Sequence, residues 1–138
     1  MKRVTGVGGI FYKSKDPEKA REWYGKHLGF VTNEYGSLFE FRQGAEPDKI
    51  GYLQWSPMGE NTDYYAPSKN EFMINYRVEN LVELLKVLKE EGVEIVGKME
   101  EYEYGKFAWI MDPEGHKIEL WEPVDSVFTK EYDGKTTL

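Results

Sequence analysis

The chain has 138 residues, a formal net charge of −7 and no cysteine. An acidic chain lacks the clustered positive field that nucleic acid or an anionic membrane surface requires, and a chain without cysteine has no disulfide framework, thiol nucleophile or cysteine-based zinc site. No apolar run approaches the roughly 18 residues that span a bilayer, and the first six residues show no apolar signal core, so we expect a cytoplasmic protein that does not enter a membrane.

The first half of the chain reads as a strand, a helix and three further strands. Val7 to Tyr12 is apolar and predicts the first strand. Asp16 is placed to cap a helix that has Pro17 at its first position, and Gly29 stands where a left-handed C-terminal cap is expected. The next strand candidates are residues 30–35, 38–42 and 50–55.

A polar connector over residues 56–70 separates this half from the next. It is longer than most loops in compact domains and carries the pair Tyr64-Tyr65, which is typical of a lid or binding loop. The second half then begins with a strand over 72–78 and a helix that Asn80 caps, with Glu83 completing a capping box. The remaining strand candidates are residues 93–96, 107–111 and 116–121.

Landmarks of the two halves recur at offsets of 63 to 66 residues. The pairs are two helix caps, two helix ends, two tryptophans and two prolines: Asp16/Asn80, Gly29/Gly92, Trp55/Trp121 and Pro57/Pro123. We interpret them as tandem βαβββ modules over 4–57 and 71–123, each unable to bury its sheet alone. The prediction is an α+β fold with one domain over residues 1–123 and a C-terminal tail over 124–138.

The last two strands form a hairpin that places one carboxylate among aromatic residues. The turn Asp112 to Gly115 has the residues that a type I turn prefers. After it, Lys117, Glu119 and Trp121 alternate with apolar residues, the period of a half-buried strand. Glu119 therefore shares a sheet face with Trp121, where it can be a metal ligand, a general base or a rim charge.

Two βαβββ modules ending in D-P-E-G-x-x-I-E-L-W resemble the glyoxalase, bleomycin-resistance and extradiol-dioxygenase group, the vicinal oxygen chelate superfamily. The resemblance covers about residues 4–123 and extends to lactoylglutathione-lyase-like members whose substrate is unassigned. It implies that the modules curl into one shared curved sheet with an inner cup, and that two chains pair as a homodimer.

The resemblance also implies where metal ligands would fall. Glu119 matches the ligand on the last strand of the second module, while Gly9 and Met73 match the first-strand ligands. The remaining position falls on Leu53, or on Gln54 after a shift of one residue. Divalent metals in such sites need about three protein nitrogen or oxygen ligands, so we expect no cofactor, with a divalent metal bound only by a non-standard ligand set.

Strand alternation gives the residues that face the cup once Glu119 is placed inward. On the first strand they are Val7, Gly9, Phe11 and Lys13. With Glu119 as the catalytic candidate, the predicted ligand-binding residues are Phe11, Trp55, Met73, Asn75, Arg77, Trp109, Trp121 and Tyr104. The plainer interpretation is that these aromatic side chains fill the cup as a packed core, with Arg77 paired to Glu119 or at the rim.

Three hypotheses on function remain open. The first is a glyoxalase-like protein that binds a small organic molecule in an aromatic cup without a metal, with Glu119 as general base if it is an enzyme. The second is a metal-dependent lyase, isomerase or dioxygenase that uses Glu119 and Gln54 with a residue from a second subunit. The third is a non-catalytic dimeric interaction module.

Overall fold

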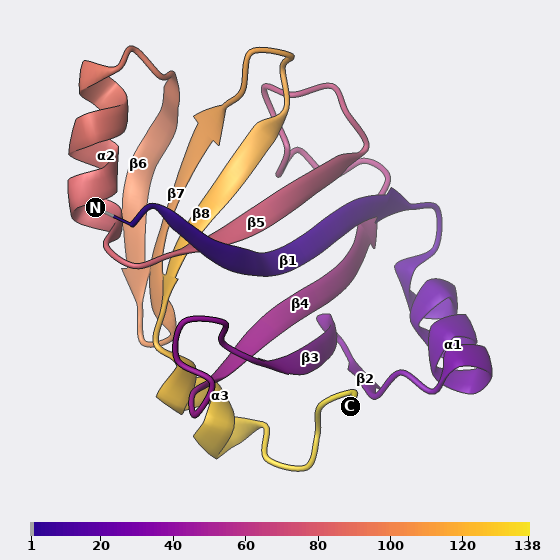
Figure 1. Cartoon of the computed structure of the whole chain (residues 1–138). Coiled ribbons are helices and arrows are strands. Elements are labelled where there is room, and N and C mark those ends of the chain that lie inside the picture. The colour runs from indigo at the N-terminus through magenta and orange to yellow at the C-terminus, as the bar shows by residue number, and fades with distance from the viewer. Residues whose placement is uncertain (1) are drawn as a thin grey trace.

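The computed structural model describes residues 2–138, which form a mixed sheet and three helices (Figure 1). The first two helices follow the order that the repeat predicts, and the third lies in the segment predicted only as a tail. The elements of the first module are β1 (Val4–Ser14), α1 (Pro17–Leu28), β2 (Thr32–Asn33), β3 (Gly36–Arg42) and β4 (Ile50–Gly59). Those of the second module are β5 (Phe72–Val78), α2 (Leu81–Glu90), β6 (Ile95–Tyr102), β7 (Gly105–Met111) and β8 (Lys117–Pro123), and α3 (Asp125–Glu131) follows.

The two modules share one curved eight-stranded sheet with strand order β2-β3-β4-β1-β5-β8-β7-β6. Their first strands meet in its centre, where β1 and β5 run antiparallel. Each first strand also pairs in parallel with the last strand of its own module, β1 with β4 and β5 with β8. The predicted α+β class with a shared curved sheet is confirmed.

Both long helices begin and end at the residues that the sequence indicates. The Asp16 side chain accepts a hydrogen bond from the Lys19 amide at 3.1 Å, and Asn80 accepts one from the Glu83 amide at 3.2 Å. Gly29 adopts the left-handed conformation with φ 73° that favours glycine after a helix. These caps satisfy amide groups that otherwise have no partner within the helix.

Two apolar clusters hold the second module together. Under α2, buried side chains from the helix and the outer side of the sheet form the first cluster: Val78, Leu81, Leu84, Ala108 and Leu120. The second cluster joins Tyr65 of the 60–71 connector to Met73 and Trp109. The connector is therefore packed against the inner side of the sheet near β5 and β7.

The segment after residue 123 folds back over the first module. Phe128 of α3 lies with its ring centroid 5.5 Å from those of both Tyr52 and Trp121. Further on, Thr137 donates its amide to the Leu38 carbonyl at 2.8 Å and shares a 2.6 Å hydrogen bond with the Ser37 hydroxyl. This C-terminal segment thus contacts strands of both modules.

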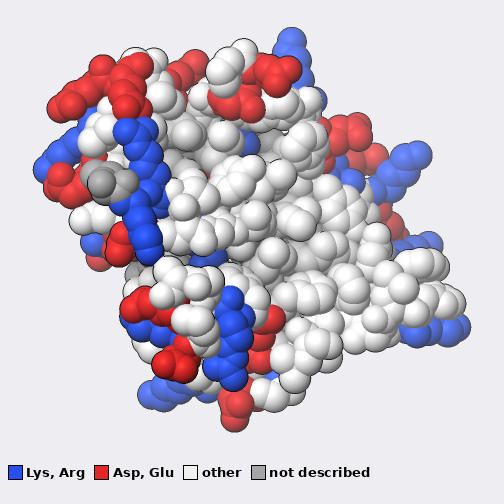
Figure 2. Space-filling model, in the orientation of Figure 1, with Lys and Arg blue, Asp and Glu red and all other residues white. Residues whose placement is uncertain are grey.

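One face of the molecule carries few charges. Figure 2 shows charged side chains gathered along the edges of this face and a broad uncharged area across its middle. The exposed apolar residues include Val7 and Ile10 on β1 and Trp23 on α1. None of the helices within residues 2–138 combines the length and apolar character needed to cross a membrane.

Candidate functional site

The sheet register brings four inner positions into one row across the central strands. Gly9 on β1 pairs with Gln54 on β4 and with Asn75 on β5, and Asn75 pairs in turn with Glu119 on β8. Because strands that are neighbours in a sheet lie about 4.8 Å apart, this row is the floor of the cup. Its polar groups are one carboxylate and two carboxamides.

Glu119 is 2% exposed, and three side chains donate hydrogen bonds to its carboxylate. Asn75 Nδ2 lies 2.7 Å from one oxygen, Trp109 Nε1 lies 2.9 Å from the other, and the Tyr64 hydroxyl donates to that second oxygen as well. A buried carboxylate requires such donors, since leaving it unpaired would cost several kcal/mol. All three donors are neutral, so the carboxylate has no charged hydrogen-bond partner.

Tyr64 reaches this floor from the connector between β4 and β5. Lys117 of β8 holds the same residue by its backbone, with Nζ 2.8 Å from the Tyr64 carbonyl oxygen. Burial, with the Glu119 carboxylate beside it, raises the pKa of Tyr64 well above its usual range, so the phenol stays a donor. Burial lowers the pKa of Lys117, an effect that Glu119, Asp63 and Glu100 oppose.

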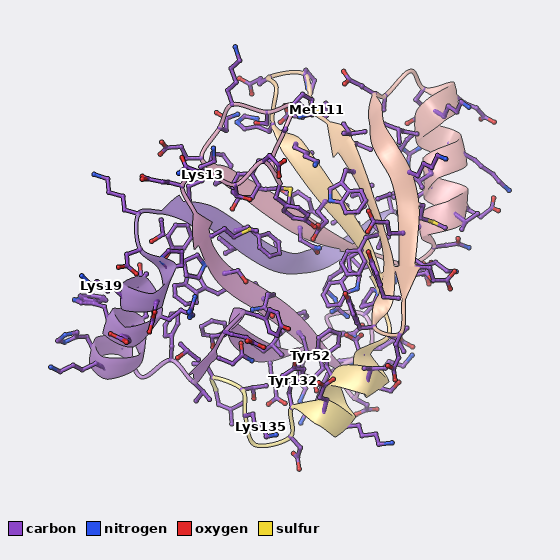
Figure 3. All side chains as sticks on the ribbon, turned by 180° about the vertical axis from the view of Figure 1, so that it is seen from behind. Lys13, Lys19, Tyr52, Met111, Tyr132 and Lys135 are labelled. Carbon is purple, nitrogen blue, oxygen red and sulfur yellow. The ribbon has the colours of Figure 1, made fainter. Side chains whose placement is uncertain are left out.

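A cavity of about 810 Å³ lies above this floor, within the roughly 300–1,000 Å³ of small-molecule sites. Figure 3 shows the side of the sheet on which it lies, with Tyr52 and Tyr132 near α3 at its lower end. The lining includes Phe11, Leu38, Gln54, Ser56, Met58, Tyr64, Asn75, Tyr102, Tyr104, Phe107, Trp109, Glu119, Trp121, Val127, Phe128 and Tyr132. Ten of the aromatic side chains of the protein contribute to this wall.

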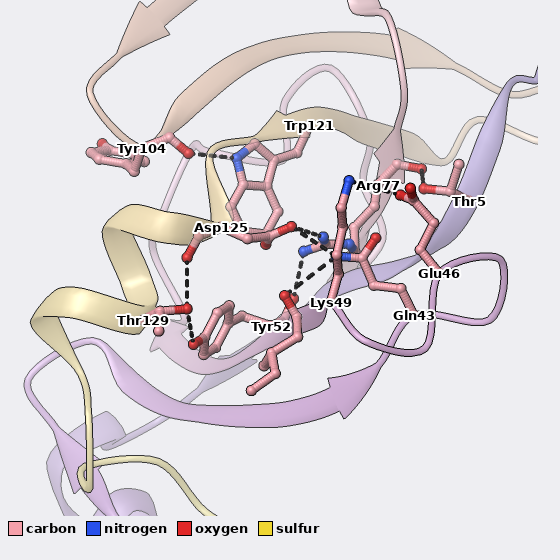
Figure 4. Close-up of polar contacts among 11 residues, drawn as sticks. Thr5, Gln43, Glu46, Lys49, Tyr52, Arg77, Tyr104, Trp121, Asp125 and Thr129 are labelled. Carbon is pink, nitrogen blue, oxygen red and sulfur yellow. Dashed lines mark hydrogen bonds and ion pairs between the residues drawn. The ribbon is translucent and has the colours of Figure 1, made fainter.

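The C-terminal segment supplies one wall of the cavity, and a buried ion pair holds it in place (Figure 4). Arg77 of β5 extends its guanidinium to Asp125 at the start of α3, with 2.5 Å between Nη2 and Oδ2. The same guanidinium lies over the Trp121 ring and donates to the Tyr52 carbonyl at 3.3 Å. Arg77 therefore links the second module to the helix that carries Phe128.

Six of the nine predicted site residues line the cavity: Glu119, Phe11, Asn75, Trp109, Trp121 and Tyr104. The other three lie elsewhere. Trp55 points to the opposite side of the sheet, where its ring packs 4.7 Å from Tyr24 and 5.0 Å from Phe30. Met73 is fully buried beneath Tyr65, and Arg77 is paired with Asp125 rather than with Glu119.

Two register effects explain the wrong orientations. The repeat aligned Trp55 with Trp121 and so placed Trp55 in the cup. In β4, however, Gln54 and Ser56 face the cup. Leu53 and Trp55 alternate with them and face away. In β1 the register shifts between Val7 and Gly9, so Gly8 is an extra residue and Val7 faces outward. A side chain at Gly8 would meet Asn75 Oδ1 at 2.3 Å, so the bulge there requires glycine.

Sequence reasoning missed the residues that reach the cup from outside the repeat. The sequence places Tyr64 only in a lid-like connector, and it places Phe128 and Tyr132 only in a C-terminal tail. The tyrosine pair and the aromatic residues of the tail were the available indications. Nothing local in the sequence tells which of them meets Glu119, because Tyr64 lies 55 residues away from it.

The residues at the floor do not suit a divalent metal. The four floor positions hold Gly9, Gln54, Asn75 and Glu119, and Met73, which the resemblance assigned to a metal ligand, is buried against Tyr65 instead. Gln54 uses its Nε2 to donate to the Tyr35 carbonyl and to Ser56 at 3.2 Å. Both Glu119 oxygens already accept hydrogen bonds. Residues 2–138 contain no cluster of three His, Cys, Asp or Glu side chains that would hold a metal ion, and a single carboxylate falls short of the usual ligand number.

Comparison with protein families identifies the class of the chain. Residues 9–120 match the model of the Glyoxalase/Bleomycin resistance protein/Dioxygenase superfamily. Since this match spans most of the sequence, the chain belongs to that superfamily. A comparison with curated proteins finds no significant match.

Solved structures of low sequence identity share the fold. Methylmalonyl-CoA epimerase from Mycobacterium tuberculosis is 22% identical, with a TM-score of 0.57 over 92% of this chain and 93% of its own. The enzyme of that name from Streptomyces coelicolor is 14% identical, with a TM-score of 0.61 over 88% and 99%. A Mn(II)-bound glyoxalase from Novosphingobium aromaticivorans is 15% identical, with a TM-score of 0.56 over 88% of this chain and 40% of its own.

Proposed function

We propose that this chain binds a small organic molecule in the aromatic cup, with Glu119 and Asn75 orienting it. The observation that carries the proposal is the cavity of about 810 Å³ with a buried carboxylate at its floor. A packed core would have filled this volume, because protein interiors leave few voids larger than a water molecule. Aromatic walls around a few placed polar groups are the usual composition of a ligand site.

A titration of isotope-labelled protein with a library of small aromatic fragments tests this proposal. We expect the indole N–H signals of Trp109 and Trp121 and the Asn75 side-chain amide to shift together. The Trp23 indole on α1 serves as an internal control, because it lies 53% exposed outside the cup. Fragments that shift only Trp23 and Trp55, or that bind nowhere at millimolar concentration, would refute the proposal.

A catalytic role for Glu119 is the second candidate, and its hydrogen bonds favour it. The donors from Asn75 and Trp109 belong to strands, whereas Tyr64 belongs to a connector. Displacement of the phenol would expose one carboxylate oxygen as a general base while two donors keep it oriented. Two of the structural neighbours are epimerases, but at their low identity they support the fold alone.

Glu119→Gln separates binding from catalysis once a turnover assay exists. The amide has the same shape but cannot accept a proton, so we expect turnover to fall by about 10²-fold or more while the fragments still enter the cup. Turnover that survives this change would remove Glu119 as the base. Activity that depends on an added divalent ion and is lost in Glu119→Ala would instead support the metal-dependent hypothesis.

We also propose that two copies pair through the uncharged face of β1 and α1. Acidic chains repel one another less where the surface lacks charge. Figure 2 shows such an uncharged area, and Ile10 on β1 is 42% exposed. Sedimentation should show a dimer that Ile10→Lys dissociates. The matched control is Met99→Lys, which changes an equally exposed apolar residue on the edge strand β6. A monomeric native chain would refute the pairing.

A further inference from the structure

The charge of the cavity wall has one sign. Four glutamates line it: Glu34, Glu100 and Glu131 around the exposed rim, and Glu119 at the buried floor. Within residues 2–138, no lysine, arginine or histidine lines the cavity. Low-dielectric walls of one sign concentrate the field inside a cleft, so this cup attracts positively charged molecules and disfavours anions.

The nearest cationic side chains are committed to other partners. Lys117 donates to the Tyr64 carbonyl, with its Nζ over the Tyr64 and Trp109 rings. Arg77 is paired with Asp125. Neither side chain forms an ion pair with Glu34, Glu100 or Glu131 within residues 2–138.

The aromatic residues of the wall add to this preference. Tyr102 and Tyr104 stack with their ring centroids 5.3 Å apart and an interplanar angle of 7°. Phe107 and Trp121 form a second stack at 5.7 Å and 9°, in which the Arg77 guanidinium lies over the Trp121 ring, so a ligand cation would meet the Phe107 side of this stack. The face of such a ring is electron-rich and attracts ammonium and guanidinium groups, most strongly where water is excluded.

The polar atoms left for a ligand at the floor are acceptors. The indole N–H of Trp109 donates to Glu119, that of Trp121 donates to the Tyr104 carbonyl at 3.1 Å, and the Asn75 amide donates to Glu119. Asn75 Oδ1, in contrast, accepts no hydrogen bond from any of residues 2–138; it is buried against Gly8 of β1, so a ligand reaches it only if the Asn75 side chain turns toward the cavity. A buried acceptor without a partner favours a ligand that brings an N–H donor.

From the one-sided charge, the stacked rings and the unpaired Asn75 oxygen, we propose that the ligand of the cup is an organic cation. It carries a protonated amine on a flat apolar body. The amine lies toward Glu119 and Asn75, and the apolar body lies between the aromatic walls. This inference rests on the proposed function, because it names the class of molecule that the same site takes.

Three probes of matched shape and different charge test the inference. They are 4-phenylbutan-1-amine, 4-phenylbutan-1-ol and 4-phenylbutanoate, titrated separately against labelled protein near pH 7, where the amine is protonated. We expect the amine to bind in the cup about three- to thirtyfold more tightly than the alcohol, and the carboxylate to bind most weakly. The preference for the amine should shrink as NaCl is raised from about 20 to about 500 mM.

Glutamine variants show which glutamate causes the preference for the amine. Glu119→Gln should weaken amine binding by about tenfold and weaken alcohol binding by a clearly smaller factor. Glu100→Gln at the exposed rim should weaken it by less than about fivefold. Glu101→Gln is the matched control, because this neighbour on β6 is exposed and does not line the cavity.

The outcomes separate the two proposals. If the alcohol or the carboxylate shifts the Trp109 and Trp121 signals at the same concentrations as the amine, the cup binds small molecules but the charge inference is wrong. If the amine binds with signals confined to other surfaces, or no probe binds, the proposed function fails as well. Equal loss of amine binding in Glu101→Gln and Glu119→Gln would also overturn the inference.

Discussion

The two modules have the same topology but bury different kinds of residue on the two sides of the shared sheet. In the second module, α2 places Leu81 and Leu84 in an apolar cluster, while β5 and β8 present Asn75 and Glu119 to the cup. In the first module, α1 contains no fully buried residue and packs through aromatic rings such as Tyr24 against Trp55.

The position of the Glu119 carboxylate depends mainly on the packing of the second module. The strands that hold the carboxylate are supported from behind by a close-packed aliphatic core, so the hydrogen bonds to Glu119 rest on a rigid base. The first module contributes walls and a single amide, Gln54, and its aromatic packing is less enclosed. The second module therefore positions the carboxylate, and the first module contributes part of the cavity wall.

Truncating one leucine on each helix tests this contrast most strongly. Leu84 is 2% exposed and Leu28 is 56% exposed. Leu84→Ala removes buried methyl groups and leaves a cavity, so we expect a loss of about 3 kcal/mol in the free energy of unfolding. Leu28→Ala should cost less than about 0.5 kcal/mol. Urea unfolding measures both, and similar losses would mean that the first module is packed as tightly as the second.

Removal of the Arg77 guanidinium tests whether the ion pair with Asp125 holds α3 against the second module. Arg77→Met leaves Asp125 without its cationic partner, and we expect a loss of about 2–4 kcal/mol, since breaking a buried pair strands the other charge. The double variant Arg77→Met with Asp125→Leu should recover part of that loss. If the double variant is less stable than either single one, the ion pair is not the link.

The stability of the protein at alkaline pH should depend more on Tyr64 in the connector than on Tyr12 of the first module. Burial raises the pKa of Tyr64 above its usual range, and burial together with Tyr24 raises the pKa of Tyr12 to about 12. A tyrosine whose folded pKa is raised stabilises the protein fully below about pH 10, and this stability is lost as the pH rises further, because the unfolded chain ionises first.

From pH 10 to 12 the native chain should therefore lose stability. Tyr64 accounts for at most about 1.4 kcal/mol per pH unit, and Tyr12, which is closer to solvent, for a smaller share. Tyr64→Phe should flatten the dependence of urea midpoint on pH more than Tyr12→Phe does. A slope that neither substitution changes would show that these phenols do not carry the effect.

The helix caps give the smallest expected difference. Asn80→Ala should cost about 1 kcal/mol and Asp16→Ala about half of that, since fraying of α1 exposes no buried residue. Thermal unfolding of the two variants measures this. A larger loss of stability in Asp16→Ala than in Asn80→Ala would show that α1 contributes more to the core than its exposure indicates.

The repeat and the strand period were sufficient to predict the architecture and the inward position of Glu119. Both rest on local patterns, such as helix caps and alternation, that the folded chain preserves. The orientation of Trp55 was not predictable in this way, because a one-residue shift in register moves a side chain to the other face. The bulge at Gly8 had the same effect on Val7.

Contacts between distant segments could not be predicted. Arg77 finds Asp125 in the C-terminal segment, and Glu119 finds Tyr64 in the connector, through packing that no sequence period encodes. The polar character of Asn75 and Glu119 marked the floor of the cup. Which loop closes over that floor depends on the tertiary structure as a whole.

The double attachment of Tyr64 to β8 has a consequence for the speed of binding. Lys117 holds the backbone of this residue and Glu119 holds its hydroxyl, so the proposed ligand would reach the carboxylate only after the phenol leaves. Association through such an opening step is slower than diffusion allows. Removal of the hydroxyl in Tyr64→Phe would shorten both the waiting time for entry and the residence time, so the tyrosine acts on rates more than on occupancy.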